Sequence, residues 1–176
     1  MSNAFTPSPL PGNHWQPCGA QYVAVYGTLR AGGVNDIRRL RPSIVCLGTT
    51  LVTGTLHDLG WYPGLSLSGV QPVLAEIYPL DDELELALDR IEGLWPTDMG
   101  EYAKRLLTLP VTASITAPEA HAQVQQELQV LLYEALPQAL RNTPVIHSSD
   151  WLSWFSHQNR PVPEQKFQLR SAADNG

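Results

Sequence analysis

The sequence predicts an α+β domain in which a small barrel-like sheet is flanked by short helices. One observation is the order of elements, because strand-like stretches predominate and one strong helical segment follows late in the domain. Another is the turn content, since 15 prolines and 13 glycines indicate a chain that turns often, which disfavours a helical bundle. The third is the length of 176 residues, which at about 150 residues per domain corresponds to one domain with some excess.

The excess residues are assigned to the two ends. Residues 1–20 are expected to form an irregular, proline-rich arm, and they lack the basic start and the apolar run of a signal peptide. Residues 161–176 have no apolar periodicity and are expected to form a polar tail. The working domain is therefore expected over residues 21–160. No run of about 18 apolar residues occurs, so the sequence predicts no transmembrane helix.

The net charge restricts the classes of partner, and the cysteine content indicates the cellular compartment. Lys and Arg number 11 against 17 Asp and Glu, a net charge of −6, so the chain lacks the basic footprint that binds nucleic acid or anionic lipid. We therefore expect neither nucleic acid nor a membrane as partner, while the oligomeric state is left open. Only Cys18 and Cys46 are present, without a CxxC motif or a Cys/His cluster. This pattern is typical of a reduced, cytoplasmic protein without a structural zinc ion.

The first half of the domain is predicted to consist mainly of strands. An apolar run over residues 22–26 indicates a buried strand that ends at Gly27. Asn35 is a predicted N-cap for a short helix over residues 36–40, which Pro42 would terminate. Further strands are expected at residues 44–47, 50–56 and 71–78, separated by turns at Pro63-Gly64 and Gly69.

The strongest helix prediction covers residues 81–92. Asp82 and Glu85 have the spacing of a reciprocal cap, and Gly93 is a natural residue to follow the helix. The apolar stripe of this helix consists of Leu84, Leu88 and Ile91.

The second half of the domain contains one ambiguous segment. Alternating side chains predict a strand over residues 102–111. Residues 119–134 fit a helical stripe, yet Leu128, Val130 and Leu132 also alternate as in a strand, so periodicity leaves both structures open. Residues 148–158 begin with Ser and Asp and carry closely spaced aromatic side chains, which favours a short helix packed on the core.

The sequence contains none of the common catalytic signatures. The G-x-S-x-G, H-E-x-x-H, Walker and G-x-G-x-x-G patterns are all absent. The five histidines are scattered without ligand spacing, so no metal site is expected. Neither cysteine has a charged neighbour in sequence that would lower the pKa of its thiol, which makes a catalytic thiol unexpected.

Two features remain as candidates for chemistry. At Tyr26-Gly27-Thr28-Leu29-Arg30 a strand ends in a glycine turn, which is either an ordinary transition to a loop or a turn whose backbone N–H groups bind an anion. Glu92 lies in the last turn of the predicted helix, where the helix dipole and Asp89 both disfavour its charge. Glu92 is therefore either solvated or placed in a site where a raised carboxyl pKa is useful.

Taken together, these features resemble a known family. The runs VAVYGTLRAG (residues 23–32), YPG (62–64) and LDRIEG (88–93), followed by Tyr102, are similar to the gamma-glutamylcyclotransferase-like superfamily, especially its gamma-glutamylamine cyclotransferase-like branch. The resemblance covers roughly residues 22–155. It implies a mixed β-barrel with flanking helices, and it favours a strand over residues 127–134.

The resemblance also implies an activity. In this family the α-amine of a small gamma-glutamyl conjugate attacks its own side-chain carbonyl, which releases 5-oxoproline and a free amine without a cofactor. Glu92 would be the general acid/base, and the backbone of Gly27, Thr28 and Leu29 would bind the anionic end of the substrate or the developing oxyanion. Tyr26 and Tyr102 would line the pocket and donate hydrogen bonds, or else be core aromatics with satisfied hydroxyls. Arg30 is expected to be a structural or surface charge rather than a ligand.

Two features of the sequence depart from the family pattern. Lys104 stands where family members often carry Arg, and a lysine cannot reproduce a bidentate contact to a carboxylate. The loop over residues 94–101 is longer than expected and would affect the mouth of the pocket.

The alternative to an enzyme is a non-catalytic member of the same fold that binds a small ligand or a protein, with an exposed Trp95 and the proline-rich arm as docking surface. A cavity bordered by both Glu92 and residues 27–29 would favour the enzyme, whereas a carboxylate in bulk solvent would favour the binding protein.

Overall fold

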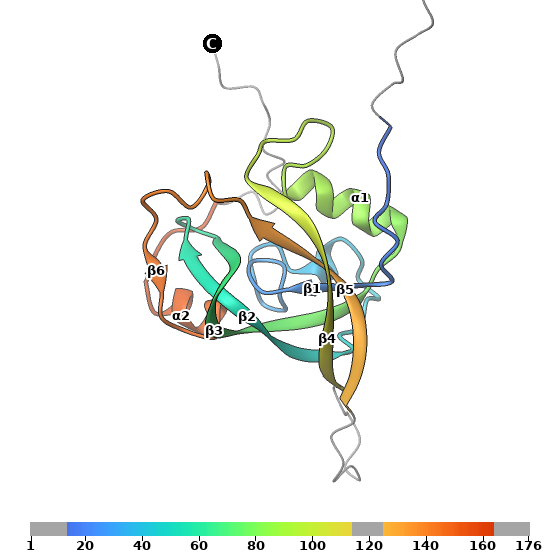
Figure 1. The fold of residues 1–176 in the computed structure, drawn as a ribbon, viewed down its shortest axis with the longest axis horizontal. Helices are drawn as coiled ribbons and strands as arrows, with labels where there is room; N and C mark the ends of the chain where they lie inside the picture. Colours follow the sequence, from blue (N-terminus) through green and yellow to red (C-terminus); the bar gives the residue numbers. More distant parts are fainter. Residues whose placement is uncertain (1–13, 114–124, 164–176) are drawn as a thin grey trace, which may run out of the picture.

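A computed structural model describes residues 14–113 and 125–163. Its strands form a sheet in the order β3-β1-β5-β4-β2-β6, and an additional pairing of β3 with β2 closes five of them into a barrel (Figure 1). The barrel is mixed, because β1 runs parallel to β5 and its other neighbouring pairs are antiparallel. The predicted α+β class with a mixed barrel is therefore confirmed. The strands are β1 (Tyr22–Val25), β2 (Gly48–Asp58), β3 (Pro63–Pro79), β4 (Tyr102–Ala113), β5 (Gln125–Ala135) and β6 (Val145–Ile146).

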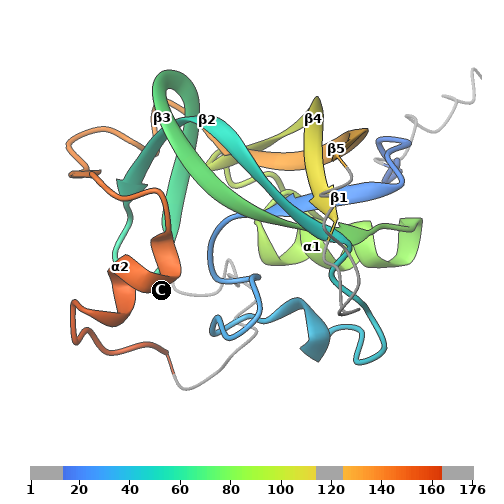
Figure 2. The same ribbon diagram turned by 90° about the horizontal axis from the view of Figure 1, so that it is seen from below.

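Two short α-helices, α1 (Asp82–Ile91) and α2 (Trp151–Ser156), lie at opposite ends of the barrel (Figures 1 and 2). Both were predicted from their caps, and α2 begins after Asp150, whose side chain accepts a hydrogen bond from the Ser153 amide. In α1 the predicted pair of capping residues is wrong. The cap is Asp81, whose Oδ1 accepts from the Leu84 amide over 2.9 Å, while Glu85 is buried and bound to Lys104. No helix in the described part of the chain is long and apolar enough to cross a membrane.

Two predictions in the first half of the domain are wrong. The segment after Asn35 is a three-residue 3-10 helix, η1 (Ile37–Arg39), capped by Asp36, because the Asn35 side chain donates to Thr28 Oγ1 instead. Residues 44–47 are not a strand. A turn at residues 42–43 precedes them, with the Ile44 amide bonded to the Arg41 carbonyl, and β2 begins only at Gly48.

Strand β3 is longer than predicted because it continues past Gly69. The register with β2 passes from Gly54 opposite Gln71 to Thr55 opposite Ser66, so residues 67–70 lie outside the pairing. Gly69 takes a φ of +129° in this excursion, a backbone conformation that side chains other than glycine rarely adopt. The predicted turn is thus an irregularity within one strand.

The ambiguous segment proves to be a strand as far as it is described. Strand β5 pairs with β4 from Gln125 opposite Thr112 to Ala135 opposite Tyr102, which also confirms the predicted strand over residues 102–111. Residues 119–124 of the ambiguous segment lie outside the described residues, as do residues 1–13 of the predicted arm and 164–176 of the predicted tail.

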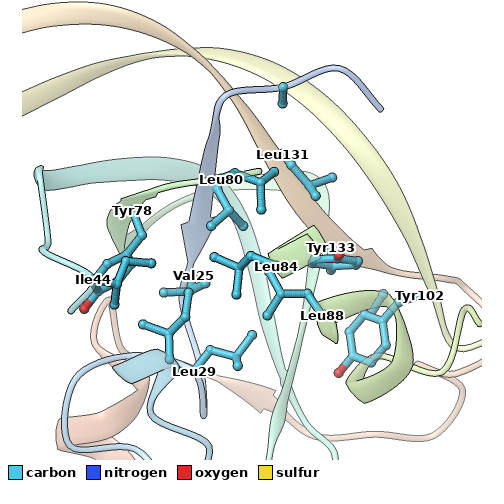
Figure 3. Packing of buried hydrophobic residues seen from close by; sticks show 14 residues of the cluster. Val25, Leu29, Ile44, Tyr78, Leu80, Leu84, Leu88, Tyr102, Leu131 and Tyr133 are labelled. Atoms are coloured by element: carbon cyan, nitrogen blue, oxygen red, sulfur yellow. The ribbon is translucent and has the colours of Figure 1, made fainter. Parts of the chain in front are cut away.

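One hydrophobic cluster joins α1 to the barrel and thereby places the end of the helix. Figure 3 shows Leu84 and Leu88 of α1 lying among Val25 of β1 and Leu131 and Tyr133 of β5. Leu84 is 2% exposed and Leu88 is fully buried, so this face of α1 has little freedom to move. The last turn of α1 therefore lies near the carboxyl ends of β1 and β5.

Candidate active site

A cavity opens where β1 ends. Its wall comes from the chain that leaves β1, the segment that enters β3, the last turn of α1, and the neighbouring ends of β4 and β5. All the residues predicted as site residues line it, namely Tyr26, Gly27, Thr28, Leu29, Glu92 and Tyr102. The remaining lining residues are Ala24, Val25, Asn35, Trp61, Tyr62, Pro63, Ile91 and Tyr133.

The backbone that leaves β1 forms a tight turn with its carbonyl groups occupied. The Gly27 carbonyl accepts from the Arg30 amide at 3.1 Å, and the Thr28 and Leu29 carbonyls accept from residues 35 and 37. Within the described residues no protein acceptor takes the N–H of Thr28 or Leu29, the two central residues of this turn. A Cβ at Gly27 would lie 2.7 Å from Pro63 Cγ, so only glycine allows this close approach. The turn therefore borders the cavity with backbone donors available to a ligand.

Arg30 anchors this turn through ion pairs with two carboxylates. Its side chain is 9% exposed, and Nη1 lies 2.7 Å from Asp150 Oδ1 at the start of α2. Its Nε lies 3.5 Å from Glu76 Oε2, which also accepts from the Ala31 amide at 2.9 Å. Burial raises the pKa of Glu76, and the Ala31 amide and Arg30 oppose that shift. Arg30 is thus paired with two carboxylates and is not among the residues that line the cavity.

Glu92 and the turn lie on one cavity. Glu92 is the C-cap residue of α1, half-buried, with its amide bonded to the Leu88 carbonyl at 2.8 Å. Gly93 follows with a φ of +71°, which turns the chain away from the helix axis. The carboxylate of Asp89, expected to repel that of Glu92, is paired with Lys104 at 2.8 Å, so its charge is compensated.

The hydroxyl groups of Tyr26 and Tyr102 are both bonded to the backbone. Tyr26 donates from its hydroxyl to the Tyr133 carbonyl at 2.7 Å and accepts from the Leu65 amide, and Tyr102 donates to the Pro63 carbonyl at 2.8 Å. Burial is the largest cause that raises the pKa of both phenols, so both stay protonated at neutral pH. Both side chains line the cavity, but their protons are directed to the backbone rather than to a ligand.

Sequence analysis missed several lining residues. Tyr133 comes from β5 and lies opposite Lys104 in the register with β4, which no local pattern could have revealed. Asn35 was read as a helix cap but supports Thr28 of the turn. Tyr62 was noted only within the YPG motif, and its hydroxyl donates to Glu101 Oε1 at 2.7 Å. Within residues 14–113 and 125–163, no three His, Cys, Asp or Glu side chains gather as metal ligands.

Lys104 and the 94–101 loop lie outside the cavity wall. Lys104 binds Glu85 and Asp89, so it has no access to the carboxylate of a ligand in this cavity. Residues 99–101 instead border a neighbouring hollow, which shares Tyr62 with the cavity. Trp95 is half-buried rather than exposed.

Comparison with known proteins identifies the family. Residues 23–153 match the family model described as "Gamma-glutamyl cyclotransferase, AIG2-like". The chain belongs to this family. Among curated proteins, a Vibrio cholerae serotype O1 protein named "Putative gamma-glutamylcyclotransferase" is 38% identical over 72 residues, which is 41% of this chain and 62% of that protein. The match thus spans less than two thirds of that relative.

Solved structures of AIG2-like and other proteins share the fold. An AIG2-like protein from Mus musculus has a TM-score of 0.57 at 23% identity, covering 83% of this chain and 97% of its own. Protein ytfP from Escherichia coli has a TM-score of 0.50 at 25% identity, over 76% of this chain and 97% of its own. These likenesses support the cyclotransferase-like barrel as the fold of the chain.

Proposed function

We propose that this family member is an active gamma-glutamyl cyclotransferase that releases 5-oxoproline and a free amine from a small gamma-glutamyl conjugate. The observation that carries the proposal is that Glu92 and the turn over residues 27–29 border the same cavity. A carboxylate and a row of backbone donors are the groups that such a reaction requires. The cytoplasm is the proposed compartment, on the basis of the cysteine pattern.

The reaction is intramolecular, so the protein supplies neither a nucleophilic side chain nor a cofactor. The α-amine of the substrate forms a bond to its side-chain carbonyl carbon, and the bond from that carbon to the departing amine then breaks. Glu92 takes a proton from the substrate ammonium and delivers a proton to the departing nitrogen. Holding the substrate folded supplies much of the rate, because well-oriented intramolecular reactions reach effective molarities of about 10⁵ M or more.

Neutral donors would bind the negative charge of the substrate. None of the described residues that line the cavity is a lysine or an arginine. The Thr28 and Leu29 amides are therefore the proposed donors to the developing oxyanion or to the α-carboxylate. Each well-placed oxyanion donor contributes about 10²- to 10³-fold in rate.

The test is an assay of 5-oxoproline release from a panel of gamma-glutamyl amines, gamma-glutamyl dipeptides and glutathione. We expect turnover of at least one conjugate, and we expect Glu92→Gln to lose about 10²-fold or more because the proton shuttle is removed. Glu83→Gln is the matched control, since Glu83 lies on the same helix with its side chain 93% exposed. This control should keep normal turnover.

Two results would contradict the proposal. One is the absence of 5-oxoproline from every conjugate at high enzyme concentration. The other is normal turnover by Glu92→Gln. Saturable binding of a conjugate without turnover would favour the alternative of a non-catalytic binding member.

A further inference from the structure

A buried polar network lies against α1, beside the cavity. Its members are the carboxylates of Glu85 and Asp89, the ammonium of Lys104, the hydroxyl of Tyr133 and the indole of Trp15. The two carboxylates are 1% and 2% exposed, which is costly for charged groups unless they are well paired. The proposed reaction uses none of these groups directly.

Asp89 is the centre of the network because three donors converge on its carboxylate. Oδ2 accepts from Lys104 Nζ at 2.8 Å and from Trp15 Nε1 at 2.7 Å, and Oδ1 accepts from the Tyr133 hydroxyl at 2.7 Å. Its carbonyl oxygen also accepts from the Leu94 amide at 2.7 Å, in the chain that follows Glu92. Asp89 thus ties α1 to β4, to β5 and to the segment before β1.

One of these ties, together with the helix itself, links Asp89 to the wall of the cavity. Tyr133 lines the cavity, and its carbonyl accepts the Tyr26 hydroxyl, so the position of Tyr133 also fixes Tyr26. Glu92 lies three residues after Asp89, and residues three apart on a helix are neighbours. Displacement of Asp89 would therefore shift both Glu92 and the two lining tyrosines, Tyr133 and Tyr26.

The segment before β1 completes the network. Trp15 packs over Lys104, with Nζ 5.6 Å from the ring centroid, and the Cys18 amide donates to Glu85 Oε1 at 2.9 Å. Sequence analysis assigned this stretch to an irregular arm whose suggested role was that of a docking surface. In the structure, this segment donates hydrogen bonds to the two buried carboxylates of α1, those of Asp89 and Glu85.

We propose that Asp89 is a positioning residue for the cyclisation, held by Lys104 and by Trp15 from the N-terminal segment. Asp89 fixes the helix end that carries Glu92 and the Tyr133 side chain, without touching substrate itself. The inference rests on the proposed function of the same cavity.

The first test separates kcat from KM in four variants of the full chain. Asp89→Asn should lower kcat by about 10- to 100-fold with KM within about twofold, because displacements near 1 Å cost that much. Trp15→Phe, which removes only the indole donor, should lower kcat by about three- to tenfold. Lys104→Arg keeps the charge and should stay within about threefold of wild type. Arg105→Met is the control, because Arg105 is the adjacent cation of β4 and pairs with Glu134 outside the network.

The second test uses the pH dependence of kcat/KM, which a merely structural role would not move in a charge-dependent way. Among the described residues, Tyr26 after β1, Tyr102 on β4 and Tyr133 on β5 face Glu92, and Asp89 precedes it by three residues on α1, with Lys104 bound to both Asp89 and Glu85. Asp89→Asn removes a negative charge, so the acidic limb should move to lower pH. Lys104→Met removes a positive charge, so the limb should move to higher pH.

The outcomes separate this inference from the proposed function. An active wild type with Asp89→Asn and Trp15→Phe indistinguishable from Arg105→Met would overturn the positioning role and leave the proposed function standing. A wild type inactive on every conjugate would overturn both. If Lys104→Met does not fold, Asp89→Asn, Trp15→Phe and Lys104→Arg still decide the matter, since each keeps the ammonium or its charge in place.

Discussion

The hydroxyl of Tyr102 is a clear case of a site residue whose polar atom serves the fold. It is 4% exposed and donates to the Pro63 carbonyl at 2.8 Å, so Tyr102→Phe removes one buried hydrogen bond and keeps the ring. We expect a loss of about 1–3 kcal/mol in the free energy of unfolding, measured by urea denaturation. We expect kcat to change by less than about threefold, because the hydroxyl proton is not available to substrate.

A matched variant makes the Tyr102 experiment specific. Tyr22→Phe removes a hydroxyl that forms no hydrogen bond within the described residues, and Tyr22 is only half-buried. It should leave both stability and kcat near wild type. A large loss of kcat in Tyr102→Phe at unchanged stability would mean that the hydroxyl acts on substrate after all.

At the scale of elements, substitutions at the two ends of α1 should have similar effects on stability but different effects on activity. Asp81 caps the first turn, far along the helix from Glu92, whereas Gly93 follows Glu92 directly. Asp81→Ala should cost about 1 kcal/mol through the lost cap. Gly93→Ala should cost about 1–2 kcal/mol, because alanine is strained at a φ of +71° and its Cβ would meet Met99 at 3.0 Å.

The two ends of α1 should differ in activity although they resemble each other in stability. Gly93→Ala displaces the chain next to Glu92 and should lower kcat several-fold, while Asp81→Ala should leave kcat unchanged at a temperature where both variants are folded. Thermal unfolding followed by circular dichroism gives the stability, and 5-oxoproline release gives kcat. Equal kcat losses in the two variants would show that helix stability, rather than the position of Glu92, controls the rate.

At the scale of the whole molecule, the sequence predicts the parts that depend on neighbours in the chain. The cap at Asp150, the apolar stripe of Leu84 and Leu88 and the turn at Gly27 are local signals, and each corresponds to an observed feature. The strand past Gly69 was not predictable, because its irregularity depends on pairing with β2.

The unpredicted part of the site has the same cause. Lys104 meets Asp89 across 15 residues of sequence, Tyr133 meets it across 44 and Trp15 across 74. The register of β4 with β5 and the closure of the barrel bring them together, and no periodicity within a single segment encodes those distances. Local sequence signals singled out Glu92 and the turn and the family resemblance gave them roles, whereas the network around Asp89 required the structure.

Acid stability is a property of the whole molecule that the paired carboxylates control. A hydrogen bond from Arg38 is the largest cause that lowers the pKa of Asp36, to about 2. Arg41 likewise lowers the pKa of Asp81, and at Asp150 the bonds from Arg30 and the Ser153 amide outweigh burial, which acts in the opposite direction. A folded pKa below the unfolded value of about 3.9 gives stability above pH 4 that is lost as the pH falls toward 2. The pKa of Glu76 is raised in the folded protein, so its effect on stability has the opposite sign. Its contribution to folding stability is lost as the pH rises.

Asp36→Asn should therefore flatten the acid limb of the stability curve. At pH 7 the variant should be less stable by about 1 kcal/mol, a modest value because Arg38 is half-exposed and its ion pair is screened by solvent. Between about pH 4 and pH 2 the wild type should lose this advantage as Asp36 becomes protonated, so the two curves should converge. Thermal unfolding in low-salt buffers from pH 2 to pH 7 measures both curves. Parallel curves over that range would mean that the pairing of Asp36 with Arg38 adds nothing to the pH dependence, and the acid sensitivity would then have to come from Asp81 and Asp150.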